Sequence, residues 1–399
     1  MSKQIVVFNA GSSSLKFALY DLGGDGEEAL VRGAVESVGG VSRMTVTSAG
    51  RPSTETRLEA AFSPQMALTQ VFAWMSKEGL GADLVGAGHR VVHGGREFIE
   101  PVLVDASVLA KLATYNPMAP SHQPHNLAAI AAMARLYPKL PQIACFDTAF
   151  HAAKPRLASI FALPRALTEA GIQRYGFHGL SYDYIASVLP RHLGERADGR
   201  VVVAHLGHGA SMCAMRGRRS VTTTMGFSAL DGLMMGARSG AIDPGVLLYL
   251  LQEKGMSAAQ LSTLLYEQSG LLGVSGESDD MRTLLASSSA AAENAIGLFV
   301  YRITSELGAL AATLGGLDAL VFTAGIGENS AEIRARVCEG ARWLGAEIDS
   351  GANARGESVI SASGSKVALL ALHTNEEAVI ATACRKMLGG EVHGAGSHR

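Results

Sequence analysis

Apolar residues follow two spacings along the chain, and segments with one spacing alternate with segments with the other. Short continuous apolar runs bounded by polar or glycine residues predict buried strands. They occur at 5–8, 17–20, 143–146, 201–206, 212–215, 319–323 and 367–372. Apolar positions three and four residues apart predict helices. These fall at about 65–78, 105–114, 126–136, 181–193, 257–267, 291–314, 329–343 and 376–388. Because strands and helices alternate, the pattern favours an α/β fold.

Two strand–turn–strand segments with polar, glycine-bearing turns occur in different halves of the chain. The first turn is Asn9–Ser14 and the second is Gly207–Ser211. Because the same local arrangement recurs, we interpret the chain as an ancient duplication of one α/β domain. A boundary is expected near residue 150, since Ala152–Pro155 has the composition of a connector. Two similar domains would leave a cleft lined by both turns, and small ligands usually bind in clefts between domains.

The balance of charge and hydrophobicity narrows the range of partners. The 399 residues include 34 Lys and Arg against 36 Asp and Glu, a net charge of −2, and 48% of them are hydrophobic. This composition excludes a disordered chain and lacks the basic surplus of a dedicated nucleic-acid binder. Small-molecule partners are therefore favoured, and the length fits two or three domains.

The spacing of the cysteines and the hydropathy of the chain indicate the cellular compartment that suits it. The four cysteines lie tens of residues apart, at Cys145, Cys213, Cys338 and Cys384. This spacing indicates neither a zinc site nor a dense disulfide framework, so a reducing cytoplasm fits best. No apolar run approaches the ~18 residues of a membrane-spanning helix, and no membrane partner is expected. The tail from Gly389 onward is rich in Gly and His and is expected to be disordered.

The segment Asn9–Lys16 combines a tight turn, three serines and a lysine. Such a turn exposes backbone N–H groups and hydroxyls, and Lys16 lies two residues beyond Ser14 on the same strand face. These features are typical of a phosphate cradle, although an ordinary hairpin turn is the alternative. The segment is not a Walker loop, because it lacks the Gly-x4-Gly-Lys spacing and a following helix.

Two arginines are candidates for anion binding. Arg90 lies in His89–Gly95, which resembles a strand entering a loop, and Val92 beside it would line an apolar wall. The alternative for Arg90 is a surface ion pair. Arg238 lies in the loop Gly236–Pro244, where Asp243 and Pro244 predict the cap and first residue of a helix. A metal pair at His89 and His93 would need a helix, which the following glycines disfavour.

Three histidines lie beside glycine, proline or aromatic residues. His122 and His125 precede a predicted helix, for which Asn126 is expected to be the N-cap. Packing within the loop is the alternative for both, and it is preferred for His125. His178 lies between Phe177 and a glycine, a setting that suits an imidazole beside reacting charge or a buried structural histidine.

Two carboxylates occupy positions that often face a cleft. Asp147 follows a strand, and Glu376 precedes the last predicted helix. Thr374 and Glu377 match a capping box, which leaves Glu376 available for a cation. Oxygen ligands from Asn and acidic side chains suit Mg²⁺. The alternative for Asp147 is the cap of a turn.

The segment Thr323–Ser330 carries a Gly-x-Gly pattern after a predicted strand. Its glycines offer bare backbone against which a nucleotide can pack, ahead of a helix expected to be capped by Asn329 with Glu332 at the capping-box position. A lone Gly-x-Gly is weak evidence, and the Rossmann spacing is absent.

Taken together, these segments resemble the acetate kinase family of the actin, sugar-kinase and Hsp70 superfamily. The resemblance spans nearly the whole chain and rests on six segments in the family's order: Asn9–Lys16, His89–Gly95, Arg174–Gly179, Gly236–Gly240, Phe322–Asn329 and Thr374–Glu377. It implies reversible, ATP-dependent phosphorylation of a short carboxylate by a homodimer, with Mg²⁺ or Mn²⁺. It also implies two RNase H-like domains with a cleft between them, residues 1–150 plus 377–392 and residues 151–376, before a disordered tail at 393–399.

The resemblance assigns roles to matching residues. Asn9 and Glu376 would help to place the metal, with support from Asp147. Arg90, Arg238, His178 and His122 would hold the carboxylate and the transferring phosphoryl group. The groups bordering the nucleotide would be Ser12, Ser14, Lys16, His205, His208, Gly209, Asp280, Arg282, Gly325, Gly327 and Asn329. The substrate methyl group would face Val92, Ser121, Phe177 and Ala229.

The chain departs from the family's pattern around the substrate and the phosphates. Ser121 and Ala229 are smaller than the family's usual residues, so a roomier pocket that admits propionate is expected. Burying one more methylene contributes about 0.8 kcal/mol. His208 replaces an asparagine and predicts a pH dependence of nucleotide affinity near neutrality. Gln123 and His125 also depart from the pattern, and the effect of Ala241 has no explanation from the sequence.

Three alternative functions remain to be distinguished. A sugar or polyol kinase of the same superfamily would need a carboxylate base to activate a hydroxyl, and an assay for acyl phosphate separates it from an acetate kinase. A nucleotide switch of the Hsp70 or actin kind would act on a partner, yet no peptide-binding module is apparent in the sequence. A zinc hydrolase, suggested by the histidines between His89 and His208, does not fit the ligand spacing.

Overall fold

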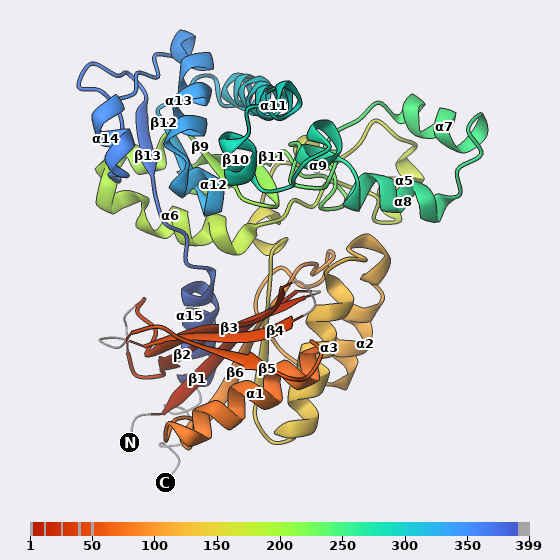
Figure 1. Cartoon of the computed structure of the whole chain (residues 1–399), viewed down its shortest axis with the longest axis vertical. Helices are drawn as coiled ribbons and strands as arrows, with labels where there is room; N and C mark the ends of the chain where they lie inside the picture. The colour runs from red at the N-terminus through yellow and green to blue at the C-terminus, as the bar shows by residue number, and fades with distance from the viewer. Residues whose placement is uncertain (1–2, 12, 25–26, 39–40, 49–51, 390–399) are drawn as a thin grey trace. The chain divides into compact units, whose positions relative to one another are not determined.

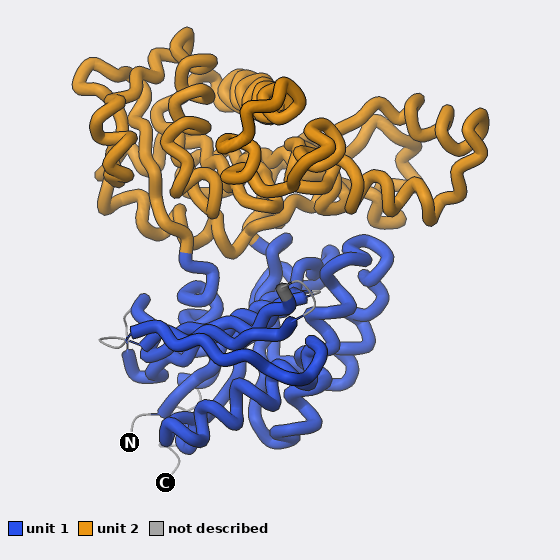
Figure 2. Tube along the Cα trace, viewed as in Figure 1, with its two compact units in different colours: residues 1–149, 375–399 blue, residues 150–374 orange. Residues whose placement is uncertain are grey.

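The chain forms two compact units, residues 1–149 with 375–399 and residues 150–374 (Figure 2). The computed structural model describes residues 3–11, 13–24, 27–38, 41–48 and 52–389. The observed divisions fall one and two residues before those expected, so Glu376 belongs to the first unit. Of the expected segments, residues 390–392 and the tail 393–399 lie outside the described residues.

The first unit is built on an eight-stranded sheet with the order β5-β4-β3-β2-β1-β6-β8-β7. Its strands are β1 (Gln4–Ala10), β2 (Ser14–Asp21), β3 (Val31–Val38), β4 (Val41–Ser48), β5 (Thr54–Leu58), β6 (Leu84–Val91), β7 (Val102–Leu103) and β8 (Gln142–Phe146). Strands β1, β6 and β8 are parallel, whereas β1 to β5 pair antiparallel in succession. The carboxyl ends of the three parallel strands therefore meet at one edge of the sheet.

Helices cover both faces of this sheet (Figure 1). They are α1 (Pro64–Lys77), α2 (Ala106–Ala113), α3 (Gln123–Leu136) and α15 (Glu376–Gly389), with a 3₁₀ turn at Asn116–Met118. Side chains of α1 and α3 form one core with the face of β1 that carries Val6 and Phe8. The other face packs against α15. A Cβ added to Gly88 of β6 would lie 2.4 Å from Cγ2 of Ile380, so the close approach of α15 requires glycine there.

The second unit is built on a five-stranded sheet with the order β11-β10-β9-β12-β13. Its strands are β9 (Val201–Leu206), β10 (Ala210–Arg216), β11 (Arg219–Thr223), β12 (Ala319–Thr323) and β13 (Ala368–Ala371). Strands β9, β12 and β13 are parallel, and β9, β10 and β11 are antiparallel. The run β3-β2-β1-β6-β8 of the first unit has the same sequence of pairings. The prediction of two RNase H-like α/β domains is confirmed.

The helices of the second unit also flank its sheet. They are α4 (Arg156–Ser159), α5 (Arg165–Glu169), α6 (Gly179–Leu193), α7 (Pro244–Gln252), α8 (Ala258–Glu267), α9 (Gly270–Ser275), α10 (Met281–Ala286), α11 (Ala290–Leu314), α12 (Ala324–Asn329), α13 (Ala331–Gly340) and α14 (Ser350–Arg355). Short 3₁₀ turns lie at Ala149–His151, Gly194–Asp198 and Arg342–Leu344. Apolar residues of α6 pack on β9, β10 and β12, and α11 contacts β10 as well as α9 and α13.

Three predicted helix starts differ from the structure. Asn126 is not an N-cap, because α3 begins at Gln123 and Asn126 is buried inside it. Asn329 ends α12, and the side chain of Ser330 instead accepts a hydrogen bond from the Ile333 amide at the start of α13.

The predicted capping box of Thr374 and Glu377 is also wrong. The side-chain oxygen of Asn375 accepts from the Ala378 amide, and the Thr374 hydroxyl donates to Ser181. In contrast, the predicted cap at α7 is confirmed, since Asp243 accepts from the Gly245 amide with Pro244 at the first helical position.

Helix α11 contradicts the expectation that no apolar segment is long enough to cross a membrane. Over Ala290–Leu314 it is long and apolar enough to cross a membrane by length and composition, the one such helix among the described residues. The sequence interpretation overlooked it because the helix includes Glu293, Arg302 and Glu306. One side of α11 is buried in the second unit, where Phe299, Ile303 and other apolar side chains enter the core.

Candidate active site

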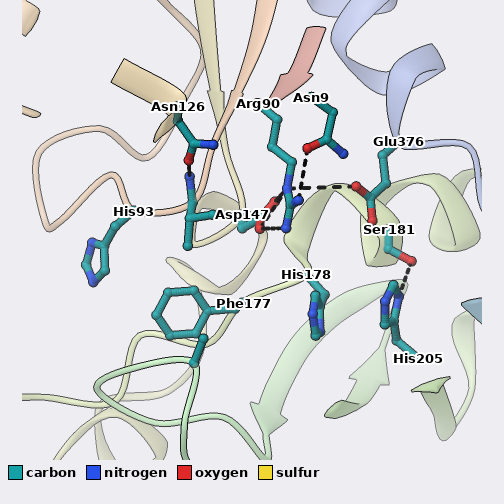
Figure 3. A network of polar contacts seen from close by, with 12 residues as sticks. Asn9, Arg90, His93, Asn126, Asp147, Phe177, His178, Ser181, His205 and Glu376 are labelled. Carbon is teal, nitrogen blue, oxygen red and sulfur yellow. Dashed lines mark hydrogen bonds and ion pairs between the residues drawn. The ribbon is translucent and has the colours of Figure 1, made fainter. Parts of the chain in front are cut away.

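Arg90 is the centre of a polar cluster at the strand ends of the first unit (Figure 3). Its Nη2 and Nε donate to Oδ2 of Asp147 at 2.6 and 3.0 Å, and its Nη1 donates to Oδ1 of Asn9 at 3.1 Å. Nε lies 3.9 Å from Oε2 of Glu376. The four side chains come from β6, the end of β8, β1 and the start of α15. The topology thus brings together four residues that lie far apart in the sequence.

The charges of this cluster are fixed by burial and by its neighbours. Burial disfavours the Arg90 cation, but the carboxylates of Asp147 and Glu376 outweigh it and raise the arginine pKa. Arg90 is therefore charged throughout the physiological range. Burial raises the pKa of Glu376 to about 7, with Asp147 and Glu377 acting in the same direction and Arg90 opposing them. An additional cation nearby would favour the charged form of this carboxylate.

The side chains of Asn9 and Glu376 have the chemistry of a magnesium site. Both present oxygen atoms, and Mg²⁺ in proteins is usually held by one or two carboxylates together with water and substrate phosphate. The described residues contain no cluster of three or more His, Cys, Asp or Glu side chains that could hold a metal. A cation at Asn9 and Glu376 would therefore complete its coordination from water or from phosphate oxygens.

The other predicted site residues of the first unit lie around the same strands. Lys16 is exposed on β2 and pairs in register with Asn9. Ser14 begins β2, and Ser12 lies outside the described residues. Ser121 and His122 are half-buried just before α3, with His122 as its N-cap residue.

The side chain of Asn126 has a role that the sequence did not reveal. Its Oδ1 accepts from the amide of Val92, and its Nδ2 donates to the carbonyl of Ala10. Asn126 therefore ties the ends of β1 and β6 together next to Arg90, and Val92 itself is buried. An asparagine before an apolar helical pattern gave no signal that separates this bridge from an N-cap.

Two stacked histidines and an arginine form a second cluster, within the second unit. The rings of His178 and His205 lie 4.1 Å apart at an interplanar angle of 14°. Buried Arg238 donates from Nη1 to the carbonyl of Ala229 at 2.6 Å. A Cβ added to Gly209 would lie 2.6 Å from Nη2 of Arg238 and 3.2 Å from Nε2 of His178. The glycine turn after β9 thus brings these donors side by side.

His178 and Phe177 stand at the entry to α6. His178 has a left-handed φ of 57°, which is uncommon for a residue with a side chain. Phe177 is buried, and its carbonyl lies 3.0 Å from Nε2 of the buried His151. The strained position of His178 is held by the fold around it, as is common at functional sites.

A cavity of about 540 Å³ lies in the second unit, within the size range of small-ligand sites. Its lining includes five residues predicted to border the nucleotide, namely His208, Asp280, Arg282, Gly325 and Asn329. It also includes residues that the sequence analysis missed, namely Gly207, Asp279, Met281, Leu285, Ile326 and Ser330. Apolar walls beside polar groups suit a purine and its ribose.

Two features of this cavity differ from the sequence interpretation. Residues 324–329 form the short helix α12 rather than a loop of bare backbone. Gly327 is buried and does not line the cavity; its carbonyl accepts from buried Arg334. His208 is exposed, and its Nε2 lies 3.1 Å from Oδ2 of Asp279, which the sequence did not pair with it.

Comparison with known proteins identifies the family of the chain. The family model described as the acetokinase family matches residues 4–382. The chain belongs to the acetokinase family. It is 56% identical over 387 residues to a protein named acetate kinase from Rhodopseudomonas palustris, covering 96% of this chain and 97% of that relative.

Solved structures of this family superpose closely on the chain. A propionate kinase from Francisella tularensis has a TM-score of 0.89 at 35% identity, covering 96% of this chain and 98% of the other. The acetate kinase of Porphyromonas gingivalis has a TM-score of 0.85 at 35% identity, covering 97% and 100%. The expected family is therefore confirmed across nearly the whole chain.

Proposed function

We propose that this chain transfers the γ-phosphoryl group of ATP to acetate, reversibly, to give acetyl phosphate and ADP. A carboxylate oxygen of acetate attacks the γ-phosphorus, and the bond to the β,γ-bridging oxygen breaks with its electron pair remaining on ADP. Family membership supports the reaction class. The single structural observation that carries the proposal is the guanidinium of Arg90, fixed by Asp147 and Asn9 among buried groups.

This chemistry needs positive charge rather than a base. Acetate is already an anion at neutral pH, so no proton has to be removed before it attacks. The barrier comes from bringing two anions together in line. Arg90 would hold the carboxylate, Arg238 the transferring phosphoryl group, and His178 and His122 would donate to its oxygens. Donors fixed in advance are effective because they need no reorganisation during the reaction.

The metal and the nucleotide would use the remaining site residues. Asn9 and Glu376 would hold Mg²⁺, which neutralises charge on the phosphates when it is bound. Ser12, Ser14 and Lys16 would border the phosphate path, as would His205 and Gly209. The cavity beside His208, Asp280 and Arg282 would receive the adenosine, with Met281 and Ile326 as apolar contacts for the base.

Propionate is the second candidate substrate. Ala229 is buried beside Arg238, to which its carbonyl is hydrogen-bonded, and both Ala229 and Ser121 are small. Similarity to a propionate kinase structure supports the same possibility. Since pockets separate substrates that differ by one methylene by only about 10- to 200-fold, we propose that both acids are accepted.

Trapping of the product tests the proposed reaction. Hydroxylamine converts an acyl phosphate to a hydroxamate, so purified protein with ATP, Mg²⁺ and acetate should form acetyl hydroxamate. Parallel reactions with propionate and butyrate measure kcat/KM along the acyl series. Consumption of ATP with a sugar or polyol, without hydroxamate from any carboxylic acid, would overturn the proposal in favour of a sugar kinase.

We also propose a cytoplasmic homodimer. Helix α7 has no buried residue, although it is largely apolar. Leu248 and Tyr249 on α7 are 54% and 50% exposed, and Val246 and Ile242 nearby are also exposed. An apolar helix of this kind is typical of an interface between subunits. The four cysteines are free and buried, which suits a reducing compartment.

A further inference from the structure

His178 is hydrogen-bonded to a chain of two hydroxyl groups inside the second unit. Oγ of Ser211 lies 2.8 Å from Nδ1 of His178 and 2.5 Å from the Tyr182 hydroxyl. Tyr182 and Ser211 are fully buried, and His178 is 9% exposed. The distances alone do not show the direction of the hydrogen bonds, but the number of protons available does.

Tyr182 must be the donor at the start of this chain. Its hydroxyl carries one proton, and Ser211 Oγ is its hydrogen-bond partner among the described residues. If Ser211 donated to it, the phenolic proton would be buried without an acceptor, which is costly. Burial also raises the pKa of Tyr182, with Cys213 acting in the same direction, so the phenol stays protonated.

The direction of the hydrogen bond from Tyr182 to Ser211 determines the direction of the hydrogen bond between Ser211 and His178. Ser211 also has a single proton, and its oxygen already accepts from Tyr182. The serine proton therefore goes to Nδ1 of His178, the other polar atom in contact with Oγ. Nδ1 is then the acceptor nitrogen, and the proton of a neutral His178 ring lies on Nε2.

His205, the stacked neighbour of His178, has the same arrangement. The Thr374 hydroxyl donates to Oγ of Ser181 at 2.9 Å, and Oγ of Ser181 lies 2.8 Å from Nδ1 of His205. Ser181 therefore donates to Nδ1, as Ser211 does. Two stacked rings with separate hydroxyl chains thus carry their N–H groups on the same kind of nitrogen.

The position of Nε2 explains why this tautomer matters. A Cβ added to Gly209 would lie 3.2 Å from Nε2 of His178 and 2.6 Å from Nη2 of Arg238, so both nitrogens face the same glycine of this turn. An N–H beside a guanidinium forms a pair of donors for a phosphoryl oxygen. A lone pair at the same place would repel that oxygen.

We infer that Tyr182 and Ser211 are positioning residues that hold His178 as the Nε2–H tautomer, so that it donates to the transferring phosphoryl group. Thr374 and Ser181 do the same for His205. The catalytic consequence rests on the proposed phosphoryl transfer, whereas the tautomer itself does not. The two can therefore be tested separately.

The tautomer is read directly from the whole protein labelled with ¹⁵N-histidine. Long-range ¹H–¹⁵N spectra distinguish a protonated nitrogen from an acceptor nitrogen, and loss of signals in His178→Gln assigns the ring. We expect a protonated Nε2 and an acceptor Nδ1 in the wild type at pH 8. A protonated Nδ1 would overturn the inference, whether or not the protein makes acyl phosphate.

Kinetics of three variants test the direction of the chain. Tyr182→Phe and Ser211→Ala should each lower kcat, by about tenfold or more, with little change in the KM for ATP or acetate. Because Tyr182 acts through Ser211, the double variant should be no slower than Ser211→Ala. If the kcat losses of the two single variants multiply in the double variant, the two residues have independent structural roles and the proposal is contradicted.

Tyr175→Phe is the matched control for the loss of a tyrosine hydroxyl. The hydroxyl of Tyr175 donates to the carbonyl of Gly171 at 2.9 Å, in the same unit. Its kcat should stay near that of the wild type. An equal loss of kcat in Tyr175→Phe and Tyr182→Phe, with the same His178 tautomer in both, would show that the effect is one of general stability.

Discussion

At the scale of single residues, Arg90 is the side chain on which the proposed chemistry depends most. Arg90→Ala should lower kcat by about 10²–10³-fold or more, because a donor fixed toward developing negative charge is lost. ATP binding should change little, since the cavity proposed for the nucleotide is formed by other residues. Steady-state kinetics and ATP titration measure the two effects.

Arg43→Ala is the control for this variant. Arg43 lies in the same unit and forms an exposed ion pair with Glu55 at 3.0 Å. Turnover of this variant should match the wild type. Near-normal kcat in Arg90→Ala, or an equal loss in both variants, would contradict the role given to Arg90.

Buried histidines should make the fold sensitive to acid. Burial lowers the pKa of His89 to about 4, while a hydrogen bond with the Gln142 side chain opposes the shift. Between that value and the ordinary pKa near 6.5, the unfolded chain binds more protons than the folded chain. The stability contributed by neutral His89 is therefore present above pH 6.5 and decreases toward pH 4, by about 2 kcal/mol at pH 5.

Urea unfolding of His89→Gln measures this contribution. The variant should lose less stability than the wild type between pH 7 and pH 5, even if it is less stable at pH 7. His192→Gln, at an exposed position, should keep the wild-type slope. If the free energy of unfolding of His89→Gln falls with pH as steeply as that of the wild type, His89 is not the group that titrates.

The residues of the candidate site could be proposed from the sequence, but their contacts could not. Asn9, Arg90, Asp147 and Glu376 were each chosen for their chemistry, and their meeting follows from the order β1-β6-β8 and the position of α15. Asp279 was missed because nothing in its local sequence pairs it with His208. Such pairs depend on tertiary packing.

At the scale of secondary structure, helix starts show where local patterns are ambiguous. Ser330 follows Asn329, and either side chain can cap a helix. The chain ends α12 at Asn329 and uses Ser330 for α13. Ser330→Ala should therefore destabilise the fold by about 1 kcal/mol, whereas Asn329→Ala should cost much less. Urea unfolding measures both, and the reverse order would favour the original prediction.

The strands that could be predicted are those whose side chains are buried, because burial requires an apolar sequence. Strand β9 is buried along its whole length and was found from its sequence. Strand β5 is an edge strand of the sequence Thr-Glu-Thr-Arg-Leu with mostly exposed side chains. It pairs through its backbone with β4, so its side chains carry no hydrophobic signal.

At the scale of the whole molecule, the repeated strand order explains why the fold class could be predicted. Both sheets contain a hairpin followed by parallel strands, and the turns of both hairpins carry glycine. Local spacing gave the duplication, and the family resemblance gave the domain type. The additional strands of the first unit required the structure.

Subunit association is a prediction at this same scale. Leu248→Glu on α7 should shift the proposed dimer toward monomer by placing a charge in an apolar interface. Sedimentation velocity measures the change. Glu253→Gln, just beyond α7, is the control and should sediment as the wild type does. A wild type that is monomeric at micromolar concentration, or an unchanged Leu248→Glu dimer, would reject this interface.

Direct measurement of acyl phosphate formation tests the central claim most directly. Wild-type protein, ATP, Mg²⁺ and acetate are combined with hydroxylamine, and the amounts of acetyl hydroxamate and ADP are quantified. We predict equal amounts of both products, and formation of both by Arg90→Ala at a rate at least about a hundredfold lower. Release of ADP and phosphate without hydroxamate would contradict direct transfer to a carboxylate.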